Sequence, residues 1–131
     1  MNRVRGYIFS RPFLGERVPQ HVQNLVIRDY CKKQGLQYML SATEYAMAGS
    51  HLILNQVMEE LPILKGIVFY SLFLLPENKP ERDKVSQIIM KNNKSIYFAV
   101  EGLRMSNKTE QERIETIWQI KKTLPQCLKG M

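Results

Sequence analysis

The sequence predicts an α/β fold, a three-layer sandwich in which a four-stranded, mainly parallel sheet carries helices on both faces. Short apolar runs alternate with longer segments of helical periodicity along the whole chain. This alternation requires crossover connections, and such connections make neighbouring strands parallel. The 131 residues, 44% of them hydrophobic, fit one domain over residues 1–131 with a substantial core.

The first half of the chain contains two predicted strands and two predicted helices. Val4–Phe9 is an apolar, aromatic run that Ser10–Arg11–Pro12 ends, because the residue before a proline avoids helical geometry. Pro19 suits the first position of a helix and Gly35 its end. On this helix the periodicity places Val22, Leu25, Val26 and Tyr30 on the buried face, and Gln23, Arg28, Lys32 and Lys33 on the other face. A second strand is predicted at 36–40, followed by a helix that Gly49–Ser50 caps and Pro62 ends.

The second half repeats the pattern. Gly66–Tyr70 is nearly all apolar, which is typical of a strand covered on both faces. A helix at 81–91, a fourth strand at 95–100 and a last helix at about 109–124 follow. We expect Thr109 to cap this last helix and Pro125 to end it. Its apolar side chains form a wide face that favours a homodimer, although the same face could simply cover the sheet: Ile114, Ile117, Trp118, Ile120 and Leu124.

The chain has more basic than acidic residues. The net charge is +7, and residues 1–33 hold five arginines and two lysines against Glu16 and Asp29. A basic surface can serve solubility alone, or it can bind nucleic acid or a phosphorylated or carboxylated small ligand. The excess of arginine over lysine favours bidentate contacts with oxyanions.

The cysteines and the apolar segments indicate a cytoplasmic protein. Cys31 and Cys127 are too few and too scattered for a disulfide framework. Arginines interrupt the amino-terminal apolar run, so we predict no signal peptide. The longest apolar run, 67–76, is too short to span a bilayer, and we expect no membrane contact.

The strand ends predict the site. In an open parallel sheet, ligands bind beyond the carboxyl ends of the strands, where the strand order reverses. This rule selects as catalytic candidates Ser10, Arg11, His21, Glu44 and Glu101, and as ligand-binding candidates Arg17, Gln20, Thr43, Tyr45 and Ser71. We expect Arg11 and Glu44 to face one crevice, with Glu44 open to solvent. Each residue also has a structural interpretation: Ser10 as a turn former, the two glutamates as partners of arginines, and His21 as a surface residue.

Sequence motifs for common cofactors are absent. The chain has no P-loop, no G-x-G-x-x-G, no H-E-x-x-H and no C-x-x-C, and no pair of residues has a spacing that suggests a metal site. We therefore predict no cofactor and no metal. Neither His21 nor His51 belongs to a recognisable nucleophile motif, so hydrolysis by a catalytic triad is poorly supported.

From Met1 to about Ser106 the layout resembles the catalytic domain of the serine recombinases, the resolvase and invertase family. The resemblance is carried by Gly6–Tyr7, Ser10, the segment 43–50 and the run 97–102. It implies a resolvase-like or flavodoxin-like fold and a link to nucleic acid. The family has an arginine two residues before its serine, where this chain has Ile8, and an arginine-rich motif after the third strand, where this chain reads Ser71–Leu75. Strand cleavage is therefore not expected, because several arginines must neutralise the phosphodiester.

A second resemblance, over most of the chain, is to the sporadic carbohydrate cluster proteins of bacteria. It is carried by the stretches 6–13, 17–24, 41–47 and 98–103. It implies a role in surface-carbohydrate or nucleotide-sugar biosynthesis, but no reaction and no catalytic residues.

Three functions follow as hypotheses. The first is a cytoplasmic protein of carbohydrate biosynthesis that binds an anionic sugar or nucleotide sugar and could be an enzyme. Arg11 and Arg17 would hold its anion and Glu44 its hydroxyls. The second is a recombinase-like module that binds nucleic acid without cleaving it. The third is an interaction protein that regulates a biosynthetic partner.

Overall fold

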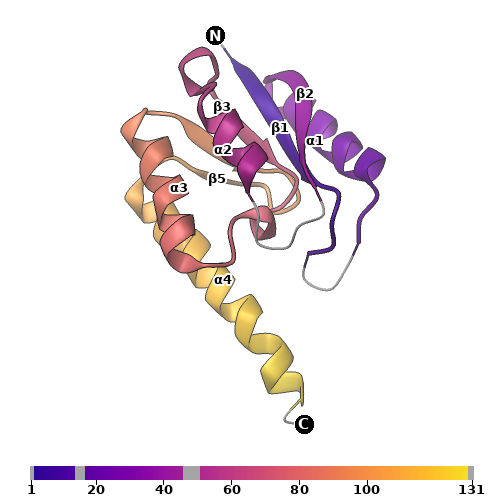
Figure 1. The fold of residues 1–131 in the computed structure, drawn as a ribbon, viewed down its shortest axis with the longest axis vertical. Helices are drawn as coiled ribbons and strands as arrows, with labels where there is room; N and C mark the ends of the chain where they lie inside the picture. The colour runs from indigo at the N-terminus through magenta and orange to yellow at the C-terminus, as the bar shows by residue number, and fades with distance from the viewer. Residues whose placement is uncertain (1, 14–16, 46–50, 130–131) are drawn as a thin grey trace.

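A computed structural model describes residues 2–13, 17–45 and 51–129, with side chains up to Lys121. The elements run in the order β1 (Arg3–Phe9), α1 (Gln20–Gln34), β2 (Gln37–Glu44), α2 (Leu52–Met58), η1 (Leu61–Ile63), β3 (Gly66–Phe69), η2 (Leu72–Leu74), α3 (Lys79–Lys91), β4 (Ser95–Phe98), β5 (Leu103–Met105) and α4 (Lys108–Lys129). The predicted α/β alternation is confirmed (Figure 1).

The sheet has five strands in the order β2-β1-β3-β4-β5. The first four strands are parallel and β5 is antiparallel to β4. The predicted count of four strands is therefore wrong by one. β5 has only three residues, and it returns along β4 after a tight turn in which the Gly102 N–H donates to the Phe98 carbonyl at 2.8 Å. Three residues are too few to show an alternating pattern in the sequence.

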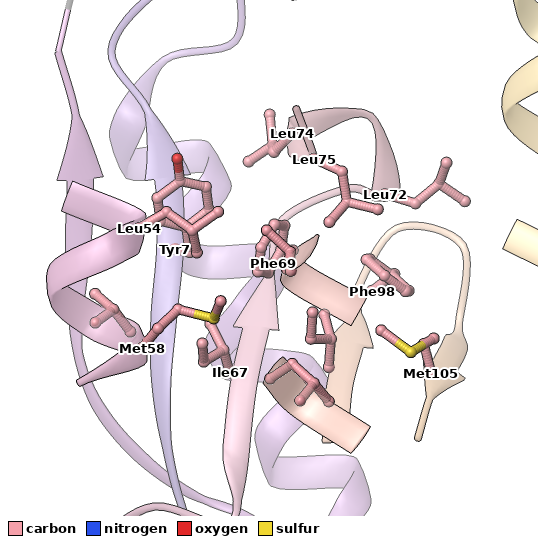
Figure 2. Packing of buried hydrophobic residues seen from close by; sticks show 14 of the residues in the cluster. Tyr7, Leu54, Met58, Ile67, Phe69, Leu72, Leu74, Leu75, Phe98 and Met105 are labelled. Carbon is pink, nitrogen blue, oxygen red and sulfur yellow. The ribbon is translucent and has the colours of Figure 1, made fainter. Parts of the chain in front are cut away.

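Two hydrophobic clusters cover the two faces of the sheet. The larger lies under α2, α3 and α4 and includes Tyr7, Phe69 and Phe98 (Figure 2). The smaller lies under α1 and includes Ile8, Ile27 and Cys31. Burial raises the pKa of the Cys31 thiol to about 11, so this thiol stays protonated at neutral pH. The predicted placement of helices on both faces is thus confirmed, with α1 on one face and α2, α3 and α4 on the other.

The ends of α1 follow the prediction, but its rotation does not. Gly35 ends the helix with φ of 69°, and Pro19 is the residue just before the first turn. The buried stripe is Gln23, Ile27 and Cys31, whereas Leu25 is 62% exposed. Leu25 was predicted inside and Gln23 outside, and both predictions are wrong. A polar residue in a buried stripe cannot be recognised from hydrophobicity.

Several predicted boundaries also shift. β2 extends to Glu44 and does not end at Leu40, and α2 ends at Met58, so that Pro62 lies in η1. α4 begins one residue before Thr109, and the Asn107 side chain accepts from the Glu110 N–H at 2.9 Å as the cap. α4 continues through Pro125 to Lys129. The predicted cap Gly49–Ser50 lies outside the described residues.

The apolar face of α4 covers the body of its own chain. Ile114 and Trp118 are buried in the larger cluster and Ile117 packs against it, whereas Ile120 is exposed. The Leu124 side chain lies outside the described residues. Most of the face that favoured a homodimer therefore has a partner within the chain. In Figure 1 the end of α4 extends beyond the sheet.

No helix in the described ranges is both long enough and apolar enough to cross a bilayer.

Candidate functional site

The reversal of strand order lies between β1 and β3. The chain leaves β1 through α1 to form β2 on one side and returns through α2 to form β3 on the other side. The carboxyl ends of β1 and β3 therefore flank the crevice that this topology uses for ligands. Ser10–Arg11 follows β1 and Ser71 closely follows β3, as predicted.

Ser10 is half-buried at this edge and bonded to the end of β2. Its backbone N–H and its hydroxyl both point to the Glu44 carbonyl oxygen, at 2.9 and 3.0 Å. The hydroxyl donates to that oxygen, and this contact holds Ser10 beside β2.

Glu44 is only 2% exposed, so the prediction of a solvent-facing carboxylate is wrong. Oε2 accepts from the Tyr7 hydroxyl at 2.8 Å and from the Leu54 N–H at 3.1 Å. Oε1 accepts from the Ile53 N–H at 3.2 Å. Burial, with Glu44 as the second cause, raises the pKa of Tyr7 well above its usual range. The carboxylate holds the first turn of α2 against β1 and β2, where it satisfies N–H groups that the helix leaves unpaired.

Ser71 and Glu101 form a second structural contact. Ser71 is buried and donates from its hydroxyl to Glu101 Oε2 at 2.7 Å, and it accepts from the Phe73 N–H at 3.2 Å. Glu101 Oε1 accepts from the Leu72 N–H at 3.0 Å. The pair connects the end of β3 to the β4–β5 turn and fixes the start of η2.

Gln23 is a residue at this edge that the sequence did not single out. It is fully buried, and its amide brackets the last residue of β1: Nε2 donates to the Phe9 carbonyl at 2.8 Å, and Oε1 accepts from the Phe9 N–H at 3.0 Å. Nε2 also donates to the Val18 carbonyl at 2.9 Å. Gln23 thereby sets the position from which Ser10 and Arg11 leave the sheet.

Arg11 lines a cavity of about 320 Å³. It is 8% exposed, its Cζ lies 4.3 Å from the centre of the Phe9 ring, and Nη1 donates to the Tyr45 carbonyl at 3.2 Å. The cavity walls include Phe9, Phe13, His51 and Phe73, and the exposed residues that line it are Pro12, Glu77, Asn78 and Glu81.

The residues of the predicted site therefore take different partners. Arg11 lines the cavity, Glu44 holds α2, and Ser71 with Glu101 forms the contact beside η2. Thr43 is half-buried in β2, and Arg17, Gln20, His21 and Tyr45 are exposed. The sequence missed Phe73 and the rim at 77–81. Asn78 could have been found as the cap of α3, but no local signal shows that it lines one cavity with Arg11.

In the described part of the chain, no three side chains of the His, Cys, Asp or Glu types lie close enough together to hold a metal ion.

Solved structures that are similar to this chain include an integrase domain and a resolvase family recombinase. The N-terminal catalytic domain of TP901-1 integrase superposes with a TM-score of 0.64 at 16% sequence identity, over 95% of this chain and 98% of that one. A resolvase family site-specific recombinase from Streptococcus pneumoniae superposes with a TM-score of 0.62 at 11% identity, over 97% of both chains. The chain has a resolvase-like fold.

This resolvase-like fold covers more of the chain than the resemblance in sequence, which ended at about Ser106. At these identities the likeness concerns the fold alone. No family model and no curated protein sequence matches the chain, and the resemblance to sporadic carbohydrate cluster proteins has no support.

Proposed function

We propose that the chain is a nucleic-acid-binding module with a resolvase-like fold that contacts the phosphate backbone along α1 and does not cleave the strand. The observation that carries the proposal is a row of exposed basic side chains on α1 and just before it, in a fold shared with an integrase catalytic domain and a resolvase family recombinase. The net charge of +7 agrees with an anionic polymer as the partner.

The row, called here the α1 stripe, consists of Arg17, which precedes the helix, and of His21, Arg28 and Lys32 on it, all exposed. The last three lie on one face of the helix, because seven and eleven residues are close to two and three turns. At about 1.5 Å per residue the stripe from His21 to Lys32 is roughly 16 Å long, which is enough to follow a few phosphates of one strand. The neighbouring Asp29 is paired with Lys33 at 2.9 Å, so it does not neutralise the stripe.

The contacts at Ser10 argue against cleavage. Transfer of a phosphodiester to a serine develops negative charge that several preorganised cations must stabilise. Arg11 lies in the cavity over Phe9. After β3, residues 71–75 include no arginine, and four of the five are buried. Ser10 is therefore a positioned hydroxyl that lacks the arginine cluster that this reaction needs.

Binding is tested by fluorescence anisotropy with a labelled DNA duplex over a range of salt concentrations. We expect the logarithm of the affinity to fall linearly with the logarithm of salt concentration, because binding releases counterions. The double variant Arg28→Ala/Lys32→Ala should bind at least about tenfold more weakly and lower the slope by about two units.

The matched control is Lys65→Ala/Lys91→Ala, which removes the same charge from exposed positions outside α1. This control should keep most of the affinity. Equal losses in the two double variants would mean that the net charge binds nucleic acid without a defined surface, and the α1 stripe would have no special role.

Cleavage is tested with supercoiled plasmid and with a nicked duplex. We expect no relaxation of the plasmid and no covalent protein–DNA adduct on a denaturing gel at any protein concentration. Ser10→Ala should behave like the wild type. An adduct that forms with the wild type and disappears with Ser10→Ala would show that Ser10 is a nucleophile.

An anionic sugar or nucleotide sugar in the Arg11 cavity is the second candidate. The buried guanidinium of Arg11 favours it, whereas Glu77 and Glu81 at the rim oppose an anion. Such a ligand would bind saturably with weak salt dependence, and at 100 times its Kd it would raise stability by about 2.7 kcal/mol in a thermal-shift assay. Steep salt dependence without any stabilising sugar ligand supports the nucleic-acid module instead.

A further inference from the structure

We propose that the cavity beside Arg11 binds a neutral planar heteroaromatic ring of the nucleobase type. The ring is that of a free nucleoside or of an unstacked base in a strand. This inference rests on the proposed function only where the ring is an unstacked base in a strand. It concerns the cavity, whose described lining includes no residue of the α1 stripe.

The size and walls of the cavity fit such a ring. Its volume of about 320 Å³ is at the lower end of the roughly 300–1,000 Å³ found for small-molecule sites. Phe73 is half-buried and contributes an aromatic wall, and bases stack on aromatic side chains regardless of sequence. The Phe9 ring is 5% exposed and has the Arg11 guanidinium over it, so it supports Arg11 and does not itself stack on the ligand. Phe73 is held in place, because its ring packs edge-on against Trp118 with the centroids 5.1 Å apart. Trp118 is itself fixed by a bond from Nε1 to the Leu72 carbonyl at 3.2 Å.

Arg11 adds a second flat surface. Its guanidinium lies 4.3 Å from the centre of the Phe9 ring, and the bond to the Tyr45 carbonyl limits its rotation. A guanidinium plane stacks on bases as aromatic rings do. Arg11 is only 8% exposed, so the orientation of its side chain is fixed before a ligand binds.

The rim selects for amino groups and against anions. Among the described residues that line the cavity, Glu77 and Glu81 contribute two carboxylates and Arg11 contributes one guanidinium. A carboxylate accepts from the exocyclic amino group of a base, as Glu and Asp do from cytosine N4. Asn78 uses Oδ1 to accept from the Glu81 N–H at 3.3 Å, and its amide N–H groups remain as donors toward ring nitrogens and carbonyls. This mixture of acceptors and donors suits the hydrogen-bonding edge of a base better than a phosphate or a carboxylated sugar.

The experiment is isothermal titration calorimetry of the whole chain with adenosine, cytidine, uridine and thymidine. We expect adenosine and cytidine to bind saturably and at least about fivefold more tightly than uridine and thymidine, because only the first two carry an exocyclic amino group. Glu81→Gln should reduce the difference in affinity between these two pairs of nucleosides.

A blocking variant locates the site. Glu81→Trp places a large side chain at the rim from an exposed position in the first turn of α3, where the fold should tolerate it. It should weaken nucleoside binding at least tenfold. Glu59→Trp is the matched control, because Glu59 is also exposed at the end of a helix but does not line the cavity. It should bind nucleosides as the wild type does, and circular dichroism checks that both variants fold.

Two results would overturn the proposal: no heat of binding with any nucleoside, or equal binding by Glu81→Trp and Glu59→Trp. Equal affinity for all four nucleosides would overturn the role of the rim.

The experiments distinguish a failure of the cavity proposal from a failure of the proposed function. Salt-dependent binding of duplex DNA that requires Arg28 and Lys32, without nucleoside binding, rejects the cavity alone. Nucleoside binding without duplex binding rejects the α1 stripe alone. A single-stranded oligonucleotide that competes with adenosine identifies a strand as the source of the base.

Discussion

Glu44→Ala is expected to lower the free energy of unfolding by about 3 kcal/mol or more. The substitution leaves three donors without their acceptor: the Tyr7 hydroxyl and the N–H groups of Ile53 and Leu54. Each buried donor that loses its partner costs about 1–3 kcal/mol, and the missing carboxylate leaves a void as well. Because the N–H groups belong to the first turn of α2, the loss should appear as a lower urea midpoint and as reduced protection of α2 amides from hydrogen exchange.

Glu44→Gln keeps the shape of the side chain but leaves it with one hydrogen-bond acceptor oxygen in place of two. One amide oxygen can still accept from two donors, but the amide nitrogen then faces an N–H group. We expect a cost of about 1–2 kcal/mol. Glu59→Ala, an exposed glutamate at the end of the same helix, should stay within about 0.5 kcal/mol of the wild type. If Glu44→Ala is as mild as Glu59→Ala, the carboxylate does not hold α2.

Arg82→Ala is expected to cost about 3–5 kcal/mol. The Arg82 guanidinium makes a two-point contact with Glu115, with Nε 2.8 Å from Oε1 and Nη2 3.0 Å from Oε2. Nη1 donates to the carbonyls of Pro76 and Glu77 at 3.0 and 2.6 Å, and the group lies 4.6 Å over the Trp118 ring. Arg82 is 3% exposed, so its removal leaves a carboxylate and two carbonyls without their donor. Unfolding in urea, followed by circular dichroism, measures the loss.

The same substitution has a local consequence for the cavity. Pro76 and Glu77 line it, and Arg82 holds their backbone against α4. We expect the fluorescence of Trp118, the only tryptophan, to change in Arg82→Ala while the protein is still folded. Arg82→Lys should recover part of the stability, since a lysine keeps the charge but loses the planar fork. Lys84→Ala, an exposed change on the same helix, should alter neither signal. An unchanged stability in Arg82→Ala would refute the structural role of this contact.

Most of the element order could be predicted because it depends on neighbours in the chain. The run Gly66–Phe69 is entirely buried, and its lack of polar residues predicted a strand covered on both faces. Gly35 ends α1 with a positive φ, which a glycine adopts without strain. These signals are local, so they can be read in a single sequence.

The rotation of α1 could not be predicted for the opposite reason. Gln23 is buried because its amide meets the backbone of Phe9, fourteen residues away. Leu25 points to solvent because the helix turns Gln23, Ile27 and Cys31 toward the sheet. Hydrophobicity ranks Leu25 as core and Gln23 as surface, and only the partner supplied by the fold reverses that order.

The candidate site likewise has features that the sequence could predict and features that it could not. By itself, the sequence determined the alternation of strands and helices and the edge where strand ends meet, because both depend on periodicity or on residues next to one another, and it indicated the resolvase-like layout only through a resemblance. Only the tertiary structure decided where the side chains at that edge point. Glu44 satisfies the start of α2, Ser71 meets Glu101, and Arg11 lines a cavity together with Phe73 and Glu81. These contacts join segments up to about 70 positions apart along the chain, and a carboxylate or guanidinium takes whichever partner the packing brings within hydrogen-bonding distance.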